Sequence, residues 1–369
     1  MVVAQKLDTI LDKALQEIWL SREEIKFLLQ LADPVSRERV FLTARELRQR
    51  YFADKVFLYG FVYFSTYCRN DCTFCYYRKS NDLCQRYRKT TREIVDIACA
   101  LAEAGVYLID LTMGEDPQYL ANGSEGYENL LEVVRLVKKN TGLPVMISPG
   151  VVPGAILKEL QQAGADWYAC YQETHNRLLY KKLRLNQSYS ERWASKIYAR
   201  SIGMLVEEGL LVGVGDSLED IVNSLLEMKN LGAEQVRTMS FVPQQGTPLS
   251  GNGSSDDRLE LNIIAVMRIL FPDRLIPASL DVRGIFGLQQ RLNAGANVVT
   301  SLIPPDRGLV GVSQSTLDIA EGHRTVKGVM PVLRECGLAP ATLAEYQRWL
   351  QEKQGRIKNR AIGKEILCK

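Results

Sequence analysis

Apolar residues near the amino terminus recur every three or four positions, which predicts amphipathic helices. The first of these stretches contains Leu7, Ile10, Leu11, Ala14, Leu15 and Ile18. A second helix is predicted from Ser21, where Ser-Arg-Glu-Glu matches a capping box, and a third over residues 34–51. No strand pattern precedes Lys55. We therefore expect residues 1–52 to form a helical extension ahead of the main domain.

Beyond this point, short apolar runs alternate with amphipathic stretches. Residues 56–63 are almost continuously apolar, as a buried parallel strand would be. The pattern predicts seven further strands, at residues 107–112, 144–148, 167–171, 209–214, 235–242, 275–280 and 297–303. It predicts intervening helices at residues 91–104, 127–139, 156–162, 190–202, 218–231, 257–270 and 287–295, with a closing helix near 317–333.

This regular alternation predicts a (β/α)8 TIM barrel over residues 53–335, followed by a C-terminal helical tail over residues 336–369. Glycine marks most junctions, as at Gly105, Gly164, Gly203, Gly232 and Gly295. A doubly wound Rossmann sheet is the alternative, but no G-x-G-x-x-G follows the first strand. The isolated Gly-Val-Gly after the fifth strand is more typical of a turn.

Charge and hydropathy narrow the class of protein. The chain of 369 residues has a formal net charge of +3, and its Lys and Arg form no long basic block. This balance argues against nucleic-acid and membrane-surface binding. The sequence contains no uninterrupted apolar stretch of about eighteen residues and no signal-peptide core at its start. We expect a cytoplasmic protein, monomeric and without a membrane span.

Cysteine spacing gives the strongest chemical signal in the sequence. Three of the eight cysteines, Cys68, Cys72 and Cys75, follow the first predicted strand within eight residues. Three thiolates at this spacing can bind one iron–sulfur cube and leave its fourth iron open. Clusters that only transfer electrons normally have four protein ligands, so an open iron indicates that a substrate or cofactor completes the coordination. A structural zinc site would usually need a fourth ligand and is the weaker interpretation.

The other five cysteines lie singly, at Cys84, Cys99, Cys170, Cys336 and Cys368. Cys99 and Cys170 are predicted to be core residues, and Cys84 is a weak candidate for a fourth ligand. A second cluster held by these scattered cysteines has no motif to support it. The pattern does not fit a secreted disulfide framework and predicts a reducing compartment. The two histidines, His175 and His323, are too few for most zinc-hydrolase and Ser-His mechanisms, and His175 is expected behind the site or on the surface.

The C-x3-C-x2-C spacing, with Phe74 between the last two cysteines and a position after the first barrel strand, resembles the signature of the radical S-adenosylmethionine (SAM) superfamily. The resemblance implies a 4Fe-4S cluster whose open iron binds the amino and carboxylate groups of SAM. One electron from the cluster then cleaves SAM to methionine and a 5′-deoxyadenosyl radical. An electron donor of flavodoxin or ferredoxin type is the expected partner.

By the same resemblance, three further residues match SAM-binding positions. The element after the second strand resembles the superfamily's Gly-Gly-Glu, with Met113 replacing the first glycine, and Glu115 would accept from the ammonium of SAM. Glu173 matches the acidic group that binds the ribose in the biotin-synthase-like branch. Arg192 matches the arginine that pairs with the carboxylate of SAM, with Arg184 as a competitor. An acidic turn and a surface arginine are the alternatives for Glu115 and Arg192.

Longer stretches resemble the 3-methylornithine synthase family of pyrrolysine biosynthesis, at residues 64–77, 110–117, 146–150, 237–248, 277–281 and 291–297. The likeness extends from about residue 52 to about residue 310. That family isomerises L-lysine to (3R)-3-methyl-D-ornithine. In its mechanism the Cα–Cβ bond of lysine breaks to a glycyl radical and an aminobutene, which recombine at the internal alkene carbon. The resemblance therefore implies L-lysine as the substrate.

Lysine carries one carboxylate and two ammonium groups, so its pocket needs a cation and acidic acceptors. By the resemblance, five residues at predicted strand ends line the substrate site: Asp110, Ser148, Arg237, Ser279 and Asp281. A cation at Arg237 inside an apolar strand is costly unless paired, so we expect it to bind the substrate carboxylate. Asp110 and Asp281 would hold the ammonium groups. The structural alternative is an internal Asp–Arg pair across the barrel mouth.

Two other functions stay open at this point. Another biotin-synthase-like enzyme, of the hydrogenase-maturation type, would use the same cofactor on a different small substrate. A non-catalytic iron–sulfur protein would not need Glu115, Glu173 or Arg192. The combination of Arg237 with two aspartates favours the amino-acid mutase.

Overall fold

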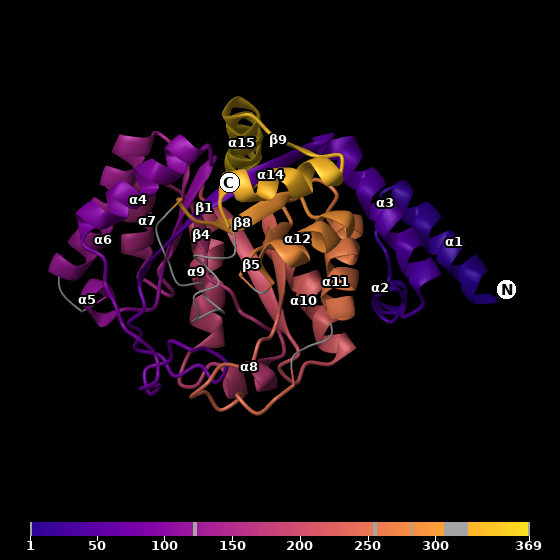
Figure 1. Ribbon diagram of the computed structural model, residues 1–369, viewed down its shortest axis with the longest axis horizontal. Helices are drawn as coiled ribbons and strands as arrows, with labels where there is room; N and C mark the ends of the chain where they lie inside the picture. Colours follow the sequence, from indigo (N-terminus) through magenta and orange to yellow (C-terminus); the bar gives the residue numbers. More distant parts are fainter. Residues whose placement is uncertain (1, 121–123, 254–256, 282, 306–323, 368–369) are drawn as a thin grey trace.

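Eight parallel strands form the centre of the molecule, with helices around them (Figure 1). The computed structural model describes residues 2–120, 124–253, 257–281, 283–305 and 324–367. The strands are β1 (Lys55–Ser65), β2 (Leu108–Met113), β3 (Val145–Ser148), β4 (Ala165–Ala169), β5 (Leu205–Val212), β6 (Gln235–Ser240), β7 (Pro277–Ser279) and β8 (Val298–Leu302).

The strands pair in the order β6-β5-β4-β3-β2-β1-β8-β7. Between β6 and β7 the sheet is joined by a single bridge, where the Val236 amide donates to the Leu275 carbonyl at 3.0 Å. The Leu275 amide donates in turn to the carbonyl of Glu234 at 3.1 Å. The predicted (β/α)8 barrel is therefore confirmed, with one short joint between its sixth and seventh strands.

The outer helices follow the strands in the predicted alternation. They are α4 (Thr91–Ala104), α6 (Ser124–Thr141), α7 (Gly154–Ala163), α9 (Tyr189–Ser201), α10 (Leu218–Leu231), α11 (Asp257–Leu270), α12 (Gly284–Asn293) and α14 (Val326–Glu335). Two short helices, α5 (Pro117–Leu120) and α8 (Arg177–Leu183), are additions that the hydrophobic pattern did not predict. Of the predicted closing helix at 317–333, residues 317–323 lie outside the described residues, and α14 covers the part from Val326 onward.

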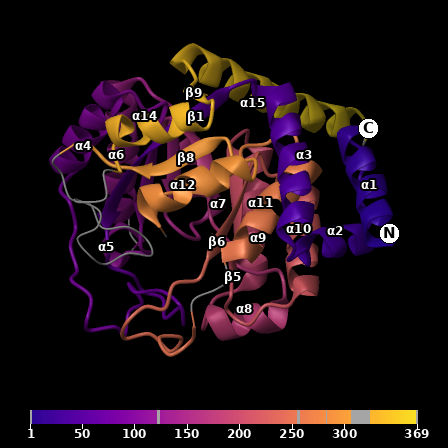
Figure 2. The same cartoon turned by 45° about the vertical axis from the view of Figure 1, so that its right-hand side comes forward.

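The amino-terminal helices were predicted correctly and pack on one side of the barrel. They are α1 (Val2–Leu15), α2 (Arg22–Leu29) and α3 (Pro34–Phe52), and Figures 1 and 2 show them beside α11 and α10. The predicted capping box at Ser21 is present, because its hydroxyl accepts from the Glu24 amide and the Glu24 carboxylate accepts from the Ser21 amide. The boundaries drawn after residues 52 and 335 stay predictions.

A carboxy-terminal helix closes one end of the barrel. It is α15 (Leu343–Leu367), which follows a two-residue strand, β9 (Ala339–Pro340), paired with the start of β1 (Figures 1 and 2). Tyr346 of α15 is fully buried, and its hydroxyl lies 2.9 Å from that of Tyr59 and 3.1 Å from the indole nitrogen of Trp167. Helix α15 therefore covers the amino-terminal end of the barrel and leaves the opposite end open for a functional site.

Within the described ranges, no helix combines the length and the apolar character needed to cross a bilayer.

Candidate active site

The site lies at the carboxyl ends of the strands, opposite α15. In Figure 1 the loop after β1, helix α8 and the loop after β6 gather there, at the lower end of the molecule. They surround a cavity of about 1310 Å³, counted with its open mouth. Each strand, or the loop directly after it, contributes to the lining: Phe61, Asp110, Ser148, Ala169, Leu211, Arg237, Asp281 and Ser301. This is the end at which TIM-barrel enzymes place their chemistry.

The three clustered cysteines line this cavity together. Cys68, Cys72 and Cys75 are all free thiols on the loop after β1. Burial raises the pKa of Cys68 to about 11, and the neighbouring Cys72 adds to the rise. Burial likewise raises the pKa of Cys75, with Cys72 and Cys68 contributing. The thiols are therefore close enough to oppose each other's ionisation, a cost that a bound cationic cluster would remove.

The donor set fits a cluster better than a single ion. Among the described residues, no three His, Cys, Asp or Glu side chains converge to hold one metal ion. The three thiols of Cys68, Cys72 and Cys75 nevertheless line one cavity, and three cysteine ligands are one short of the four that a structural zinc site usually has. Cys84 does not line the cavity. It is buried against Phe61, Tyr63 and Tyr77, and its thiol donates to the Asn81 carbonyl.

Glu115 and Arg192 form a buried ion pair beside the cysteines. An Arg192 Nη2–H donates to Glu115 Oε1 at 2.8 Å, and the Val151 amide donates to the same oxygen at 3.3 Å. Burial opposes the charge of Glu115, but Arg192 and a hydrogen bond with Asn70 hold its pKa below the usual value. The alternative of a surface arginine is wrong for Arg192, because its side chain is almost fully buried.

Glycines allow the chain to pack tightly around this pair. A Cβ on Gly114 would collide with the Tyr67 carbonyl, and a Cβ on Gly150 would collide with the Glu115 side chain. Gly150 also has a φ of +79°, which a larger residue adopts only with strain. The turn after β2 can therefore bring the Glu115 carboxylate to the cavity wall only because these positions carry no side chain.

Glu173 and Arg184 form a second ion pair close to the first. Arg184 Nη2–H donates to Glu173 Oε1 at 2.6 Å, and both side chains line the cavity. Glu173 has a φ of +67°, and its backbone bonds to Gly209 and Leu211 hold it in this conformation. A non-glycine residue held at positive φ is typical of functional sites. Arg184, which the sequence suggested only as a competitor of Arg192, thus lies in the same site.

Of the five expected substrate residues, the structure brings four to the cavity wall: Asp110, Ser148, Arg237 and Asp281. Arg237 departs from expectation, because its buried guanidinium already has a carboxylate partner within the chain. Its Nε–H donates to Glu207 Oε1 at 2.6 Å, and the Tyr171 hydroxyl donates to Glu207 Oε2 at 2.6 Å. Glu207 was missed because β5 begins at Leu205, four residues earlier than predicted.

Asp281 has an arginine partner as well. Arg324 Nη1–H donates to its Oδ1 at 3.2 Å, and the Ser301 hydroxyl donates to its Oδ2 at 3.0 Å. The internal Asp–Arg pair, offered as an alternative, is thus present at Asp281. Ser279 does not line the cavity. It is buried behind Ser301, with their hydroxyl oxygens 3.5 Å apart, and it accepts from the Asp281 amide at 3.3 Å.

Asp110 is a buried carboxylate whose ionised form is poorly stabilised by its surroundings. Burial raises its pKa to about 7, the negative charge of Glu207 adds to the rise, and Arg237 opposes it. The Thr112 hydroxyl donates to Asp110 Oδ1 at 2.9 Å. At neutral pH this carboxyl is therefore close to its midpoint, and a nearby cation would favour its ionised form.

The remaining sequence expectations have mixed outcomes. Cys170 is buried as predicted, but it also lines the cavity, with its sulfur 2.9 Å from Arg192 Nη1. Cys99 is only half-buried, so the prediction of a core residue is wrong there. His175 is buried rather than on the surface, with Nδ1 2.8 Å from the Tyr189 hydroxyl, and burial lowers its pKa to about 4. Cys368 and His323 lie outside the described residues.

Three sets of known proteins resemble this chain. The model of the radical SAM superfamily matches residues 62–228. A 3-methylornithine synthase from Methanosarcina acetivorans is 43% identical over 350 residues, which covers 95% of this chain and 99% of that protein. The FeFe hydrogenase maturase subunit HydE from Thermotoga maritima is 33% identical over 293 residues, covering 79% of this chain and 82% of that protein.

Solved structures agree with the sequence relationship. A crystal structure of methylornithine synthase superposes with a TM-score of 0.87 at 43% identity, covering 92% of this chain and 99% of that chain. The identity to methylornithine synthase exceeds that to the hydrogenase maturase and extends over more of the chain. Its sequence and its fold therefore place this chain, a radical SAM enzyme, in the 3-methylornithine synthase family.

Proposed function

We propose that this enzyme isomerises L-lysine to (3R)-3-methyl-D-ornithine, a reaction of pyrrolysine biosynthesis. One observation carries the proposal: a single cavity has three thiols at one end and an unequal set of charges at the other. Of that set, Asp110, Arg237 and Asp281 line the cavity, and Glu207 and Arg324 pair with Arg237 and Asp281 without lining it. With Asp110 ionised, the three carboxylates and two guanidinium groups have a formal charge of −1, which complements the +1 charge of lysine.

At the cofactor end, Cys68, Cys72 and Cys75 would hold the 4Fe-4S cluster. When bound, the cluster and SAM supply a one-electron reductive cleavage that begins the radical chemistry. Glu115 and Arg192 are already an ion pair at 2.8 Å. Their charges suit the two ends of an amino acid, with Arg192 binding its carboxylate and Glu115 its ammonium group. Each buried charge would then keep an opposite partner, which avoids the cost of leaving it unpaired.

Glu173 would accept from the ribose hydroxyl groups of SAM. Its carboxylate is already held by Arg184 at 2.6 Å, so it is fixed in position before the cofactor enters. A prepositioned acceptor loses little conformational entropy on binding. This arrangement supports the role that the family resemblance gives to Glu173.

At the substrate end, Arg237 would bind the lysine carboxylate, and Asp110 and Asp281 would bind its ammonium groups. Glu207 neutralises Arg237 from behind without lining the cavity itself. Ser148 would add a hydroxyl contact. Aromatic side chains such as Phe61 and Tyr171 line the space between the charged groups. Polar clamps at the ends and apolar walls between them are suited to keeping reactive fragments in place and away from water.

The proposal also includes the electron donor, the oligomeric state and the cellular compartment. The one-electron donor is of flavodoxin or ferredoxin type, the enzyme acts as a monomer, and it works in the cytoplasm. The alternative function of the hydrogenase-maturation type has weaker support than the lysine mutase. Sequence identity to that relative is 33%, against 43% to methylornithine synthase.

Anaerobic incubation with SAM, dithionite and 13C-labelled L-lysine tests the proposed reaction. We expect mass spectrometry of the derivatised amino acids to detect a labelled lysine isomer that co-elutes with 3-methylornithine. L-Ornithine serves as the control substrate, because it lacks one methylene and should give no such product. Formation of 5′-deoxyadenosine without any isomer would contradict the substrate assignment alone. A cluster-loaded protein that forms neither product would contradict the whole proposal.

The raised pKa of Asp110 leads to a prediction about pH. Because a lysine ammonium group requires the ionised carboxylate, lysine affinity is expected to increase up to about tenfold per pH unit below pH 7 and level off above it. Asp110→Asn should weaken binding at pH 8 and remove this dependence. Equilibrium binding of lysine to the cluster- and SAM-loaded protein between pH 6 and 8 measures both. Ser148→Ala is the control, which should weaken binding without moving the midpoint; a wild-type pH profile in Asp110→Asn would contradict the assignment.

A further inference from the structure

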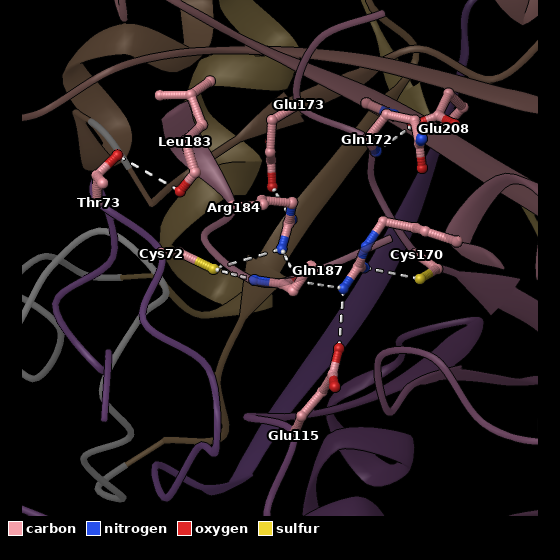
Figure 3. Close-up of polar contacts among 12 residues, drawn as sticks. Cys72, Thr73, Glu115, Cys170, Gln172, Glu173, Leu183, Arg184, Gln187 and Glu208 are labelled. Carbon is pink, nitrogen blue, oxygen red and sulfur yellow. Dashed lines mark hydrogen bonds and ion pairs between the residues drawn. The ribbon is translucent and has the colours of Figure 1, made fainter. Parts of the chain in front are cut away.

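Two side chains outside the cysteine loop contact the sulfur of Cys72. Gln187, in the turn between α8 and α9, places its Nε2 3.1 Å from Cys72 Sγ. Arg184 Nη1 lies 3.6 Å from the same sulfur. Figure 3 shows both side chains pointing at this atom from one side. Neither contact belongs to the binding roles described above for SAM or the substrate.

The orientation of the Gln187 amide is fixed by its other contacts. Its Oε1 accepts from Arg192 Nη2 at 2.9 Å and from Arg184 Nη1 at 3.4 Å. Guanidinium groups can only donate, so the amide oxygen must face the two arginines and the NH2 group must face the sulfur. Both arginines are buried and Gln187 is half-buried, so its amide oxygen is held by two donors that are fixed in the protein interior.

The sulfur atoms of the other two cysteines are contacted differently. Cys68 accepts from the backbone amides of Asn70 and Glu115, and Cys75 accepts from the backbone amide of Tyr77. Those hydrogen bonds are set by the fold of the loop and survive any side-chain substitution. The contact at Cys72 is the one that a change of side chain at position 187 can remove.

We propose that Gln187 is a positioning residue that raises the reduction potential of the cluster through its hydrogen bond to Cys72. Reduction adds an electron whose charge spreads onto the thiolate sulfurs, so a donor to sulfur stabilises the reduced state more than the oxidised state. The oxygen of the same amide is held by Arg192, the proposed partner of the SAM carboxylate. Gln187 therefore connects the SAM site to the cluster. This inference rests on the cluster in the proposed function and extends it to control of potential.

Potentiometric titration followed by the EPR signal of the reduced cluster tests this inference. The reconstituted full-length enzyme is compared with Gln187→Met, which keeps the side-chain length but has no N–H donor. We expect the equilibrium constant for reduction to fall about tenfold, which for one electron is a midpoint about 59 mV lower. Gln187→Leu, which is also uncharged and has no donor, should shift in the same direction. Gln162→Met on the exposed face of α7 is the matched control and should titrate like the wild type.

The outcomes separate this inference from the proposed function. A wild-type protein that gives no cluster signal would contradict the proposed function itself. A wild-type cluster with an unchanged or raised midpoint in iron-loaded Gln187→Met would overturn only the role of Gln187. If the methionine variant fails to retain iron, the leucine variant measures the same quantity. Loss of iron from both would show that Gln187 retains the cluster rather than setting its potential, and would also overturn the inference.

Discussion

Cys72→Ala is expected to abolish the cluster and reduce formation of 5′-deoxyadenosine and lysine isomer to background. The two remaining thiols leave the cluster one ligand short. Cys84 cannot replace Cys72, because it is buried in an aromatic cluster and does not line the cavity. The chain itself should still fold, since removing one buried sulfur typically costs only about 1 kcal/mol of unfolding free energy. Iron and sulfide analysis, the EPR spectrum and product assays on the reconstituted variant measure the loss.

A matched cysteine distinguishes loss of a ligand from general damage. Cys336→Ala changes a half-buried free thiol that lies outside the cavity. That variant should keep the iron content, the EPR signal and the products of the wild type. A Cys72→Ala enzyme with full iron and wild-type product formation would contradict the assignment of this cysteine as a cluster ligand.

The barrel was predictable where local signals decide the structure. Helices α4 and α10 have the predicted bounds because both ends carry their own signals. Thr90 and Ser217 form capping boxes at the starts, and Gly105 and Gly232 adopt left-handed conformations at the ends. Such contacts lie within one turn of the helix and are visible in a short window of sequence.

The start of β5 was misplaced because its first residues look too polar for a buried strand. Glu207 and Glu208 are fully buried there, and each is neutralised by a residue from another element. Glu207 pairs with Arg237 from the neighbouring strand, and Glu208 pairs with the buried Lys196 of α9. No local pattern reveals that a glutamate will meet its counter-ion only after the barrel has formed.

The site, too, was predictable where local sequence signals exist and not where contacts between distant segments decide. Cysteine spacing pointed to the three thiols, and the rule that strand ends carry the chemistry pointed to Asp110, Ser148, Arg237 and Asp281, all of which line the cavity. The same rule applied to β8 would also have found Ser301. Gln187 is 115 residues from Cys72, and Arg324 is 43 residues from Asp281. Their roles arise from contacts between distant segments, and neither lies in a recognisable motif. Ser279 shows the converse, since a strand-end position does not guarantee that a side chain reaches the cavity.

Arg237→Ala is expected to have two separable effects, on stability and on lysine binding. Removing the guanidinium leaves Glu207, which is fully buried, without its counter-ion. Breaking a buried pair in this way typically costs about 3–5 kcal/mol of unfolding free energy. Loss of the cation facing the cavity should also weaken lysine binding by about 2 kcal/mol or more, which is about thirtyfold. The single variant therefore cannot show by itself which effect removes activity.

The double variant Arg237→Met/Glu207→Gln separates them. It removes both charges together, so no buried charge is left unpaired, and a glutamine at 207 can still accept from the Tyr171 hydroxyl that now donates to Glu207 at 2.6 Å. We expect its thermal midpoint to return toward that of the wild type while lysine affinity stays at least about thirtyfold weaker. The EPR spectrum of the cluster should be unchanged in both variants. Wild-type lysine affinity in the double variant would refute Arg237 as the carboxylate-binding residue, because its charge would then serve only to neutralise Glu207.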